Sequence, residues 1–237
     1  MINIIDTFRN VVGDKYAMVK ILILTVPTVI SVYANLSGQA ALAGTINLAF
    51  SIVFAAIFFE TIRRSCNSEP MLLPPFMLPF RMFVTLGLTV IAAIPIIAVC
   101  VGLGMGYFYV MFNYFPNIVQ SPITMHICSF ILVLLITSLF FASVTQFLDT
   151  GKVWDAYNPI KVTLALKTFI VNNLFFVIQD MIFNLIVLLI PAYIIMVLAG
   201  MNIQNFFVIL WLSMGGVVNY LMFADYMGQT KKESEIY

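Results

Sequence analysis

Six long apolar runs divide the sequence and limit the folds that it can adopt. Each run has between 18 and 32 residues, and roughly 20 helical residues are enough to cross a hydrocarbon core about 30 Å thick. Backbone groups inside a bilayer find no water, so such runs must be helical, and they lack the alternating pattern of β-barrel strands. We predict an all-α membrane protein with six transmembrane helices, arranged as three antiparallel hairpins: Ala17–Ala34, Ala40–Ile62, Met82–Tyr107, Ile123–Phe147, Thr168–Ala199 and Phe206–Tyr226.

The low content of charged residues agrees with a surface that faces lipid. Only 9% of the residues are charged and 62% are hydrophobic, whereas soluble domains carry roughly 25% charged residues. The 11 basic and 10 acidic residues leave a net charge of +1. The composition therefore predicts the lipid bilayer as a partner and predicts no nucleic-acid role.

The basic residues indicate the orientation of the helices. The N-terminal segment, the second and fourth connections and the C-terminal tail carry Lys and Arg, whereas Asn35–Gln39, Phe108–Pro122 and Gly200–Asn205 carry none. Lys20 lies inside the first run, near enough to its start to reach the same side. Because cytoplasmic loops are enriched in basic residues, we predict a multi-pass protein of the cell (cytoplasmic) membrane with both termini in the cytoplasm.

The predicted cytoplasmic side carries segments with patterns of their own. Residues 1–14 predict an interfacial amphipathic helix, with a partner-binding helix or a frayed terminus as the alternatives. The six-helix transmembrane domain then covers residues 15–230, and residues 231–237 form a polar cytoplasmic tail. Residues 66–80 contain four prolines, which predict either a packed connector or a docking surface for a cytoplasmic protein. Asn158-Pro159 predicts an N-cap and a first-turn proline at the start of a helix.

The fifth run carries amide and carboxyl side chains in its predicted cytoplasmic half. At 100° per residue, Asn173, Asp180 and Asn184 fall on one face, with Asn172 and Gln179 beside them. We predict that this candidate polar face lines the bundle or a vestibule open to the cytoplasm, and that Lys20 forms a salt bridge with Asp180 if Asp180 lies at the inner interface. The 32 residues exceed one span, so Asp180 lies either past the midplane or at the inner interface. A half-inserted segment before the true span is a further alternative.

The sequence contains no motif that predicts catalysis. Cys66, Cys100 and Cys128 lack metal-binding spacing, and the single histidine, His126, begins the fourth run. Glu60 is spaced to pair with Arg63 and Arg64 at a helix end, which we interpret as a surface ion cluster. We therefore predict no catalytic, cofactor or metal site and no enzymatic activity.

A series of short landmarks resembles a known family. They are Glu60-Thr-Ile-Arg-Arg64, Leu73-Pro74, Thr150-Gly151 with Asp155-Ala156-Tyr157-Asn158, and Tyr226-Met-Gly-Gln229. Together they resemble bacterial and archaeal integral membrane proteins catalogued as a domain of unknown function, number 4013. The resemblance implies a multi-pass membrane protein without an assigned reaction, and it implies no catalytic residues.

Two functional hypotheses follow from these patterns. The first is a membrane subunit or scaffold that engages a cytoplasmic protein, or a second copy of the chain, through the cytoplasmic segments. The alternative is a small-solute permease or channel that uses the polar face of the fifth run. The low number of charges inside the runs favours the first, because coupled transporters hold several buried ionisable groups.

Overall fold

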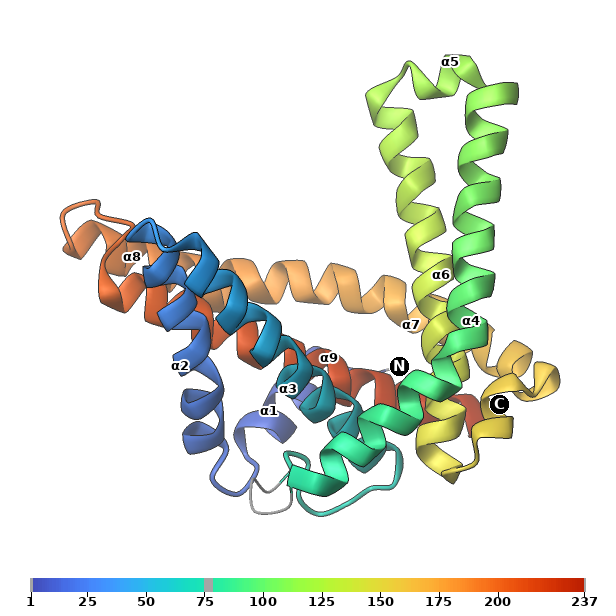
Figure 1. Cartoon of the computed structure of the whole chain (residues 1–237), viewed down its shortest axis with the longest axis horizontal. Helices are drawn as coiled ribbons and strands as arrows, with labels where there is room; N and C mark the ends of the chain where they lie inside the picture. Colours follow the sequence, from blue (N-terminus) through green and yellow to red (C-terminus); the bar gives the residue numbers. More distant parts are fainter. Residues whose placement is uncertain (1, 75–78, 237) are drawn as a thin grey trace. The chain divides into compact units, whose positions relative to one another are not determined.

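The regular secondary structure of the described residues is helical, with turns and short irregular connections between the helices. The structure is a computed structural model, and it describes residues 2–74 and 79–236. No strand occurs in these two ranges, which confirms the predicted all-α class. The helices, most of which are labelled in Figure 1, are α1 (Ile4–Val12), α2 (Ala17–Leu36), α3 (Ala40–Cys66), α4 (Pro79–Tyr114), α5 (Pro116–Val119), α6 (Pro122–Thr150), the 3₁₀-helix η1 (Val153–Tyr157), α7 (Pro159–Phe183), the π-helix η2 (Asn184–Leu189), α8 (Ile190–Leu198) and α9 (Phe206–Ile236).

Six helical stretches of the described chain are long and apolar enough to cross a membrane. Their bounds lie close to the predicted runs: Ala17–Leu36, Ala40–Cys66, Phe80–Tyr114, Pro122–Thr150, Pro159–Leu198 and Phe206–Ile236. Large apolar side chains are exposed along them, among them Leu48, Ile94 and Ile182. Because soluble proteins rarely expose so much contiguous apolar surface, these side chains face lipid, and the chain is a multi-pass α-helical membrane protein.

The chain forms two compact units. Unit 1 contains the residues up to Leu86 together with Phe176–Gln229, and unit 2 contains Gly87–Phe175 together with the residues from Thr230 onward. The helices α4, α7 and α9 contribute to both units, since the boundaries fall inside them. The predicted transmembrane domain of residues 15–230 therefore includes segments of both.

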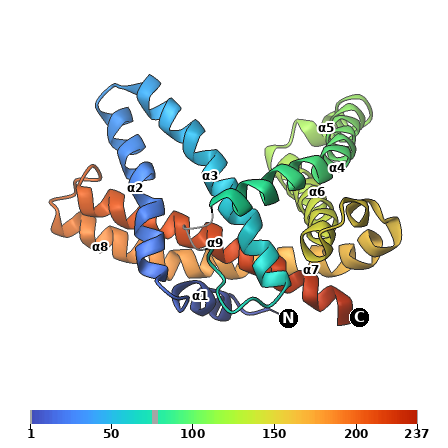
Figure 2. The ribbon, with the colours of Figure 1, turned by 60° about the horizontal axis from the view of Figure 1, so that its bottom comes forward.

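Unit 1 contains two helical hairpins. The helices α2 and α3 pack as an antiparallel pair (Figure 1), and Gly38 in their turn has a φ of 77°, which glycine adopts without steric cost. The helices α8 and α9 form the second pair, side by side in Figures 1 and 2. Aromatic rings contact one another in series between α3, α7 and α9; they belong to Phe58, Tyr220, Phe223, Phe176 and Tyr226.

The short helix α1 packs on unit 1. The side chain of Asn3 caps it by accepting a hydrogen bond from the backbone nitrogen of Ile5. Ile4, Thr7 and Val11 are buried, whereas Ile5 is exposed, so the apolar side chains of this helix do not all pack on unit 1. Ile5 lies on the side of α1 that faces away from unit 1, and the contact of this side with the membrane interface stays a prediction. Met1 lies outside the described residues.

Unit 2 contains the third hairpin, formed by α4 and α6 with α5 at its turn (Figure 1). Asn158 Oδ1 accepts hydrogen bonds from the backbone nitrogens of Ile160 and Lys161, at 3.1 and 3.3 Å, and Pro159 begins α7. This confirms the predicted cap and first-turn proline. The Tyr157 hydroxyl donates to the carbonyl oxygen of Ile91 at 3.1 Å, an acceptor released because Pro95 has no N–H to donate to it.

The fifth membrane helix is longer than predicted. It comprises α7, η2 and α8 as one stretch of 40 residues, Pro159–Leu198, which corresponds to about 60 Å, twice the thickness of a hydrocarbon core. It begins at Pro159, before the predicted Thr168, and continues without a break to Leu198. Pro191 is the second residue of α8, shortly after η2, and a π-helical turn is one way in which a helix accommodates the lost backbone hydrogen bond.

The C-terminal residues continue α9 rather than forming a separate tail. α9 runs to Ile236, which includes most of the predicted tail of residues 231–237, and Tyr237 lies outside the described residues. Lys231 is buried, with its Nζ 3.4 Å from Asp149 Oδ2 and paired with Glu235. The predicted connector of residues 66–80 is described as far as Pro74, and its apolar residues Phe76, Met77 and Leu78 lie outside the described residues.

Candidate functional site

The predicted polar face of the fifth membrane helix separates into side chains with different tasks. Asn173 belongs to unit 2, where its Nδ2 donates to Ser138 Oγ at 2.8 Å. Gln179 belongs to unit 1, where its Oε1 accepts from the backbone nitrogen of Ile4 at 2.9 Å and thereby holds the start of α1. Asn172 donates to Glu233 Oε2 at 2.8 Å within unit 2. These three side chains stabilise helix packing.

Asp180 and Asn184 do lie together, and they are joined by a residue that the sequence did not single out. Asn184 Nδ2 donates to Asp180 Oδ2 at 2.9 Å, and Asn184 Oδ1 accepts from Asn219 Nδ2 on α9. Asp180 Oδ1 is buried and has no hydrogen-bond partner among the described residues. The result is a polar chain, Asp180–Asn184–Asn219, between α7, η2 and α9 inside unit 1.

A cavity of about 210 Å³ lies beside this polar chain. Asn184 and Asn219 contribute to its wall, and the remaining lining is mainly apolar: Phe8, Val12, Met18, Ile21, Phe183, Val187, Leu188, Trp211, Met214, Gly215 and Val218. Every one of these residues belongs to unit 1. Asn219 donates its amide nitrogen to Asn184, and its side-chain oxygen is by nature a hydrogen-bond acceptor.

The π-helical turn shapes one wall of this cavity. Val187 and Leu188 lie in η2, and Trp211 Nε1 donates to the carbonyl oxygen of Leu188 at 3.2 Å. The indole thereby satisfies a backbone acceptor in a segment with irregular hydrogen bonding, and its ring stays fixed against the cavity. π-Helical turns occur frequently at functional sites. The proline signal in the sequence indicates a disturbed helix here, but nothing in the sequence pairs it with Trp211.

Lys20 does not contact Asp180, so the predicted salt bridge is wrong. Its Nζ lies 3.0 Å from Asp14 Oδ2 and donates to the carbonyl oxygen of Leu73 at 2.8 Å. The same Asp14 oxygen accepts from the backbone nitrogen of Leu73 at 3.0 Å. Asp14 lies in the turn before α2 and is therefore closer to Lys20 than Asp180 on α7 is. Through its bond to Leu73, Lys20 holds the connector that follows α3.

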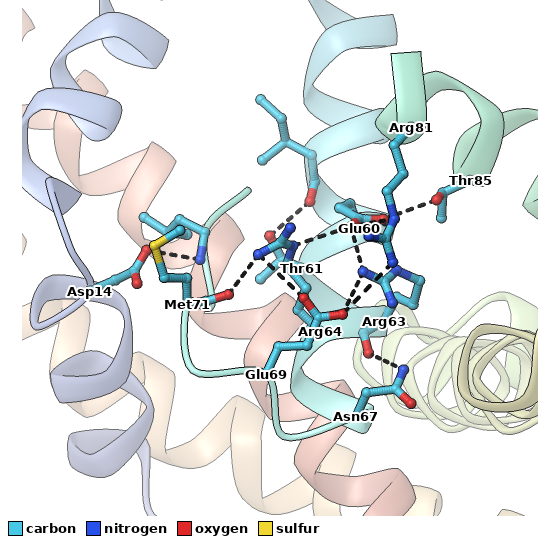
Figure 3. A network of polar contacts seen from close by, with 12 residues as sticks. Asp14, Glu60, Thr61, Arg63, Arg64, Asn67, Glu69, Met71, Arg81 and Thr85 are labelled. Atoms are coloured by element: carbon cyan, nitrogen blue, oxygen red, sulfur yellow. Dashed lines mark hydrogen bonds and ion pairs between the residues drawn. The ribbon is translucent and has the colours of Figure 1, made fainter. Parts of the chain in front are cut away.

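The charged residues at the end of α3 form a buried network, shown in Figure 3, and not the predicted surface cluster. Glu60 is only 1% exposed, and its carboxylate accepts hydrogen bonds from Arg63 at 2.7 Å, Arg64 at 3.2 Å and Thr85 at 2.9 Å. Arg64 also donates to the carbonyl oxygen of Met71 at 2.9 Å. The connector folds over the helix end, which the spacing of charges along one helix does not reveal.

Glu69 and Arg81 complete this network. The Glu69 carboxylate lies 2.7 Å from Arg63 Nη2 and 3.4 Å from Arg64 Nη1. Arg81 stays 3.9 Å from both carboxylates, and its side chain is 56% exposed. The network thus joins α3, the connector and the start of α4 within unit 1, with one guanidinium facing outward.

Asp225 is a second buried carboxylate that the sequence analysis missed. It accepts hydrogen bonds from Ser65 Oγ and Gln229 Nε2, both at 2.6 Å, and from Asn10 Nδ2 at 3.1 Å. These partners come from α3, α9 and α1, so Asp225 ties three elements of unit 1 together. The sequence signal that could have identified Asp225 is the position of an acidic residue at the cytoplasmic end of an apolar run.

Comparisons of the chain with protein-family models, with curated proteins and with solved structures found no match. Among the described residues, no group of three His, Cys, Asp or Glu side chains could hold a metal ion. His126 is exposed near the start of α6. The polar chain with its cavity and the buried charge network are therefore the two candidate sites of the described chain.

Proposed function

We propose that this membrane protein is a non-enzymatic binding protein that takes up a small, mainly apolar molecule in the cavity of unit 1. The observation that carries the proposal is the polar chain Asp180–Asn184–Asn219 beside a cavity of about 210 Å³. Apolar cavities of about 150 Å³ accept molecules of the size of benzene. The ligand therefore has the size of a substituted ring, with one hydrogen-bond donor for the side-chain oxygen of Asn219.

The position of the site supports access from the cytoplasmic side. If the last twenty residues of the fifth membrane helix cross the core, Asp180 lies near its inner edge. Phe8 and Val12 of α1 line the same cavity, and α1 belongs to the predicted cytoplasmic segments. This arrangement fits a vestibule open to the cytoplasm, and binding there is the first step that a small-solute permease requires.

The experiment uses Trp211 as a reporter of the cavity. The chain has two tryptophans, so a Trp154→Phe variant leaves Trp211 as the only indole. We titrate this variant with 4-bromophenol, whose bromine quenches a nearby indole and whose hydroxyl can donate to Asn219. We expect saturable quenching of Trp211, which Val187→Phe abolishes by filling the cavity.

Val133→Phe is the matched control, since Val133 lies on the exposed surface of α6 and the same atoms are added there. This control should quench like the parent. Quenching that rises linearly without saturation, or that is identical in Val187→Phe, contradicts the proposal.

A specific observation favours a cytoplasmic protein partner as a second function. Phe80 is 80% exposed, and it adjoins the outward guanidinium of Arg81 on the fixed end of the Glu60 network. We propose that a soluble protein presents a carboxylate to Arg81 and an apolar pocket to Phe80, which makes the chain a membrane subunit. Glu60 and Arg64 of this network are also among the landmarks that resemble the family of unknown function number 4013. We include membership in that family in this second proposal.

Affinity purification in a gentle detergent tests this second function. A stoichiometric partner should be lost from the double variant Phe80→Ala/Arg81→Ala. It should be kept by Phe112→Ala, an exposed aromatic residue on the predicted external side. Equal recovery of the partner with both variants counts against docking at Phe80 and Arg81.

A further inference from the structure

The surface around η1 in unit 2 combines exposed apolar side chains with lysines. Trp154 is 83% exposed, Ile160 is 71% exposed and Leu164 is 68% exposed. Lys152, Lys161 and Lys167 are exposed in the same stretch of sequence, and all six residues lie between the end of α6 and the first turns of α7. This group is called the η1 surface below.

The outward position of Trp154 is fixed by its neighbours. On the inner side of η1, Ser143 Oγ donates to the carbonyl oxygen of Ala156 at 2.6 Å, and Tyr157 donates to the carbonyl oxygen of Ile91. The rings of Trp154 and Tyr157 meet edge to face, at 6.2 Å between centroids. Exposing an indole ring to water costs free energy, so a rigid support that holds it outward indicates that lipid or another molecule covers the ring.

The first half of α7 has a buried face and an apolar outer face. Val162, Ala165 and Phe169 are buried in unit 2, whereas Ile160 and Leu164 point away on the opposite side. On a helical wheel, Lys167 falls close to Ile160, about two turns further along. The 40 residues of this membrane helix are twice what one span needs. The excess turns at the lysine-bearing end therefore lie outside the hydrocarbon core, yet they carry apolar side chains suited to its boundary.

The charge of the η1 surface selects the headgroup. Asp155 pairs with Lys161 at 3.1 Å, and hydrogen bonds from Thr150 and Lys161 lower the pKa of Asp155, so this carboxylate stays ionised. Asp149 is paired with Lys231. Three lysines against Asp155 leave an excess of positive charge, which complements an anionic lipid surface. A water-exposed docking face for a soluble protein does not need apolar side chains continuous with a membrane helix.

We propose that the η1 surface binds anionic phospholipid, with Trp154, Ile160 and Leu164 inserted at the headgroup–acyl boundary and Lys152, Lys161 and Lys167 facing the lipid phosphates. The amphipathic indole is suited to this depth. The surface anchors the start of α7 to one leaflet, and it is independent of the cavity and of Arg81, both of which belong to unit 1.

Trp154 itself reports on the proposed site. In a Trp211→Phe variant it is the only tryptophan, and the full-length protein is reconstituted in vesicles of phosphatidylcholine mixed with phosphatidylglycerol. Either lipid is supplied with brominated acyl chains, which quench an indole on contact. We expect strong quenching by bromines near the headgroup, weaker quenching by bromines near the chain end, and little quenching by aqueous iodide.

The lipid preference tests the role of the lysines. Brominated phosphatidylglycerol should quench Trp154 with a roughly fivefold preference over brominated phosphatidylcholine, the factor that corresponds to about 1 kcal/mol at one lysine near an anionic surface. The preference should vanish in Lys152→Gln/Lys161→Gln/Lys167→Gln. It should persist in the control Arg9→Gln/Lys15→Gln, which removes exposed basic residues from unit 1.

Two results overturn the proposal. The first is strong quenching by iodide without quenching by brominated lipid, which shows that the η1 surface lies in water and is free for a soluble partner. The second is equal quenching by both brominated lipids in the parent protein, which shows that the lysines select no headgroup.

Discussion

Asn184 is the central residue of the polar chain, because it makes one hydrogen bond to Asp180 and one to Asn219. Asn184→Leu leaves both partners unsatisfied, and we expect the free energy of unfolding to fall by about 1–2 kcal/mol, the upper range for such bonds in membranes. Asp180→Asn keeps an oxygen acceptor for Asn184 and should change stability by less than about 0.5 kcal/mol. Unfolding of the purified variants by SDS measures both values. Equal losses for the two variants contradict the described chain.

The Glu60 network gives a second prediction for single residues. Arg64 contacts Glu60, Glu69 and the Met71 carbonyl, so Arg64→Met leaves a buried carboxylate with fewer donors. We expect a loss of about 2–3 kcal/mol in the same unfolding assay. Arg81→Met is the matched control, because this exposed guanidinium lies 3.9 Å from its carboxylates, and its loss should cost at most about 0.5 kcal/mol. A control that destabilises as strongly as Arg64→Met argues against the network.

The residue-level differences between prediction and structure have a common cause. The sequence placed Glu60 at a helix end, but its burial depends on a connector that returns across α3 through Met71. The predicted pairing of Lys20 with Asp180 assumed that depth in the membrane decides contacts, whereas Asp14 lies in the adjoining turn. Asn219 and Asp225 act through partners on other helices, and no local pattern connects residues that far apart.

At the scale of elements, the contact between α3 and α9 depends on Gly228. A Cβ added there would lie 2.4 Å from Ser65 Cβ and 2.9 Å from the Ile62 carbonyl oxygen. Gly228→Ala therefore separates the two helices and weakens the bond from Ser65 to Asp225, at a cost of about 1–3 kcal/mol.

Gly216→Ala provides the control on the same helix. A Cβ at Gly216 meets no atom within 4 Å, and alanine favours helix by up to about 1 kcal/mol over glycine. Thermal unfolding in detergent should therefore rank the proteins as Gly216→Ala, wild type and Gly228→Ala, from most to least stable. Gly228→Ala matching the wild type would show that the two helices do not approach closely at this point.

The existence of the membrane helices was predictable, but their ends were not. Continuous apolar runs indicate each span without knowledge of its neighbours, because the bilayer imposes the same length on all of them. The fifth helix starts earlier than its apolar run, because Asn158 caps it and Pro159 begins it. Its first turns therefore include Lys161 and Lys167, which lie before the apolar run. The hydrogen bond from Trp211 to the Leu188 carbonyl in the π-helical turn joins two helices, and the apolarity of either run does not encode it.

For the whole molecule, the six membrane helices require that successive connections alternate between the two sides of the bilayer. All Lys and Arg residues fall on the predicted cytoplasmic side, so the orientation is a prediction that labelling can test. The native thiols are poor reporters, because Cys66 and Cys100 are buried and Cys128 is partly buried. A variant without these cysteines therefore receives single cysteines at exposed positions of the connections and the C-terminal end.

The most direct test applies a membrane-impermeant maleimide to intact cells and to inverted membrane vesicles. Asn67→Cys and Glu235→Cys should be labelled only in inverted vesicles, and Gln120→Cys and Gln204→Cys only in intact cells, since all four positions are exposed. This pattern is required by six spans with both termini in the cytoplasm. Labelling of Asn67→Cys and Gln120→Cys from the same side would contradict the spans between them, and labelling of Glu235→Cys in intact cells would contradict the orientation.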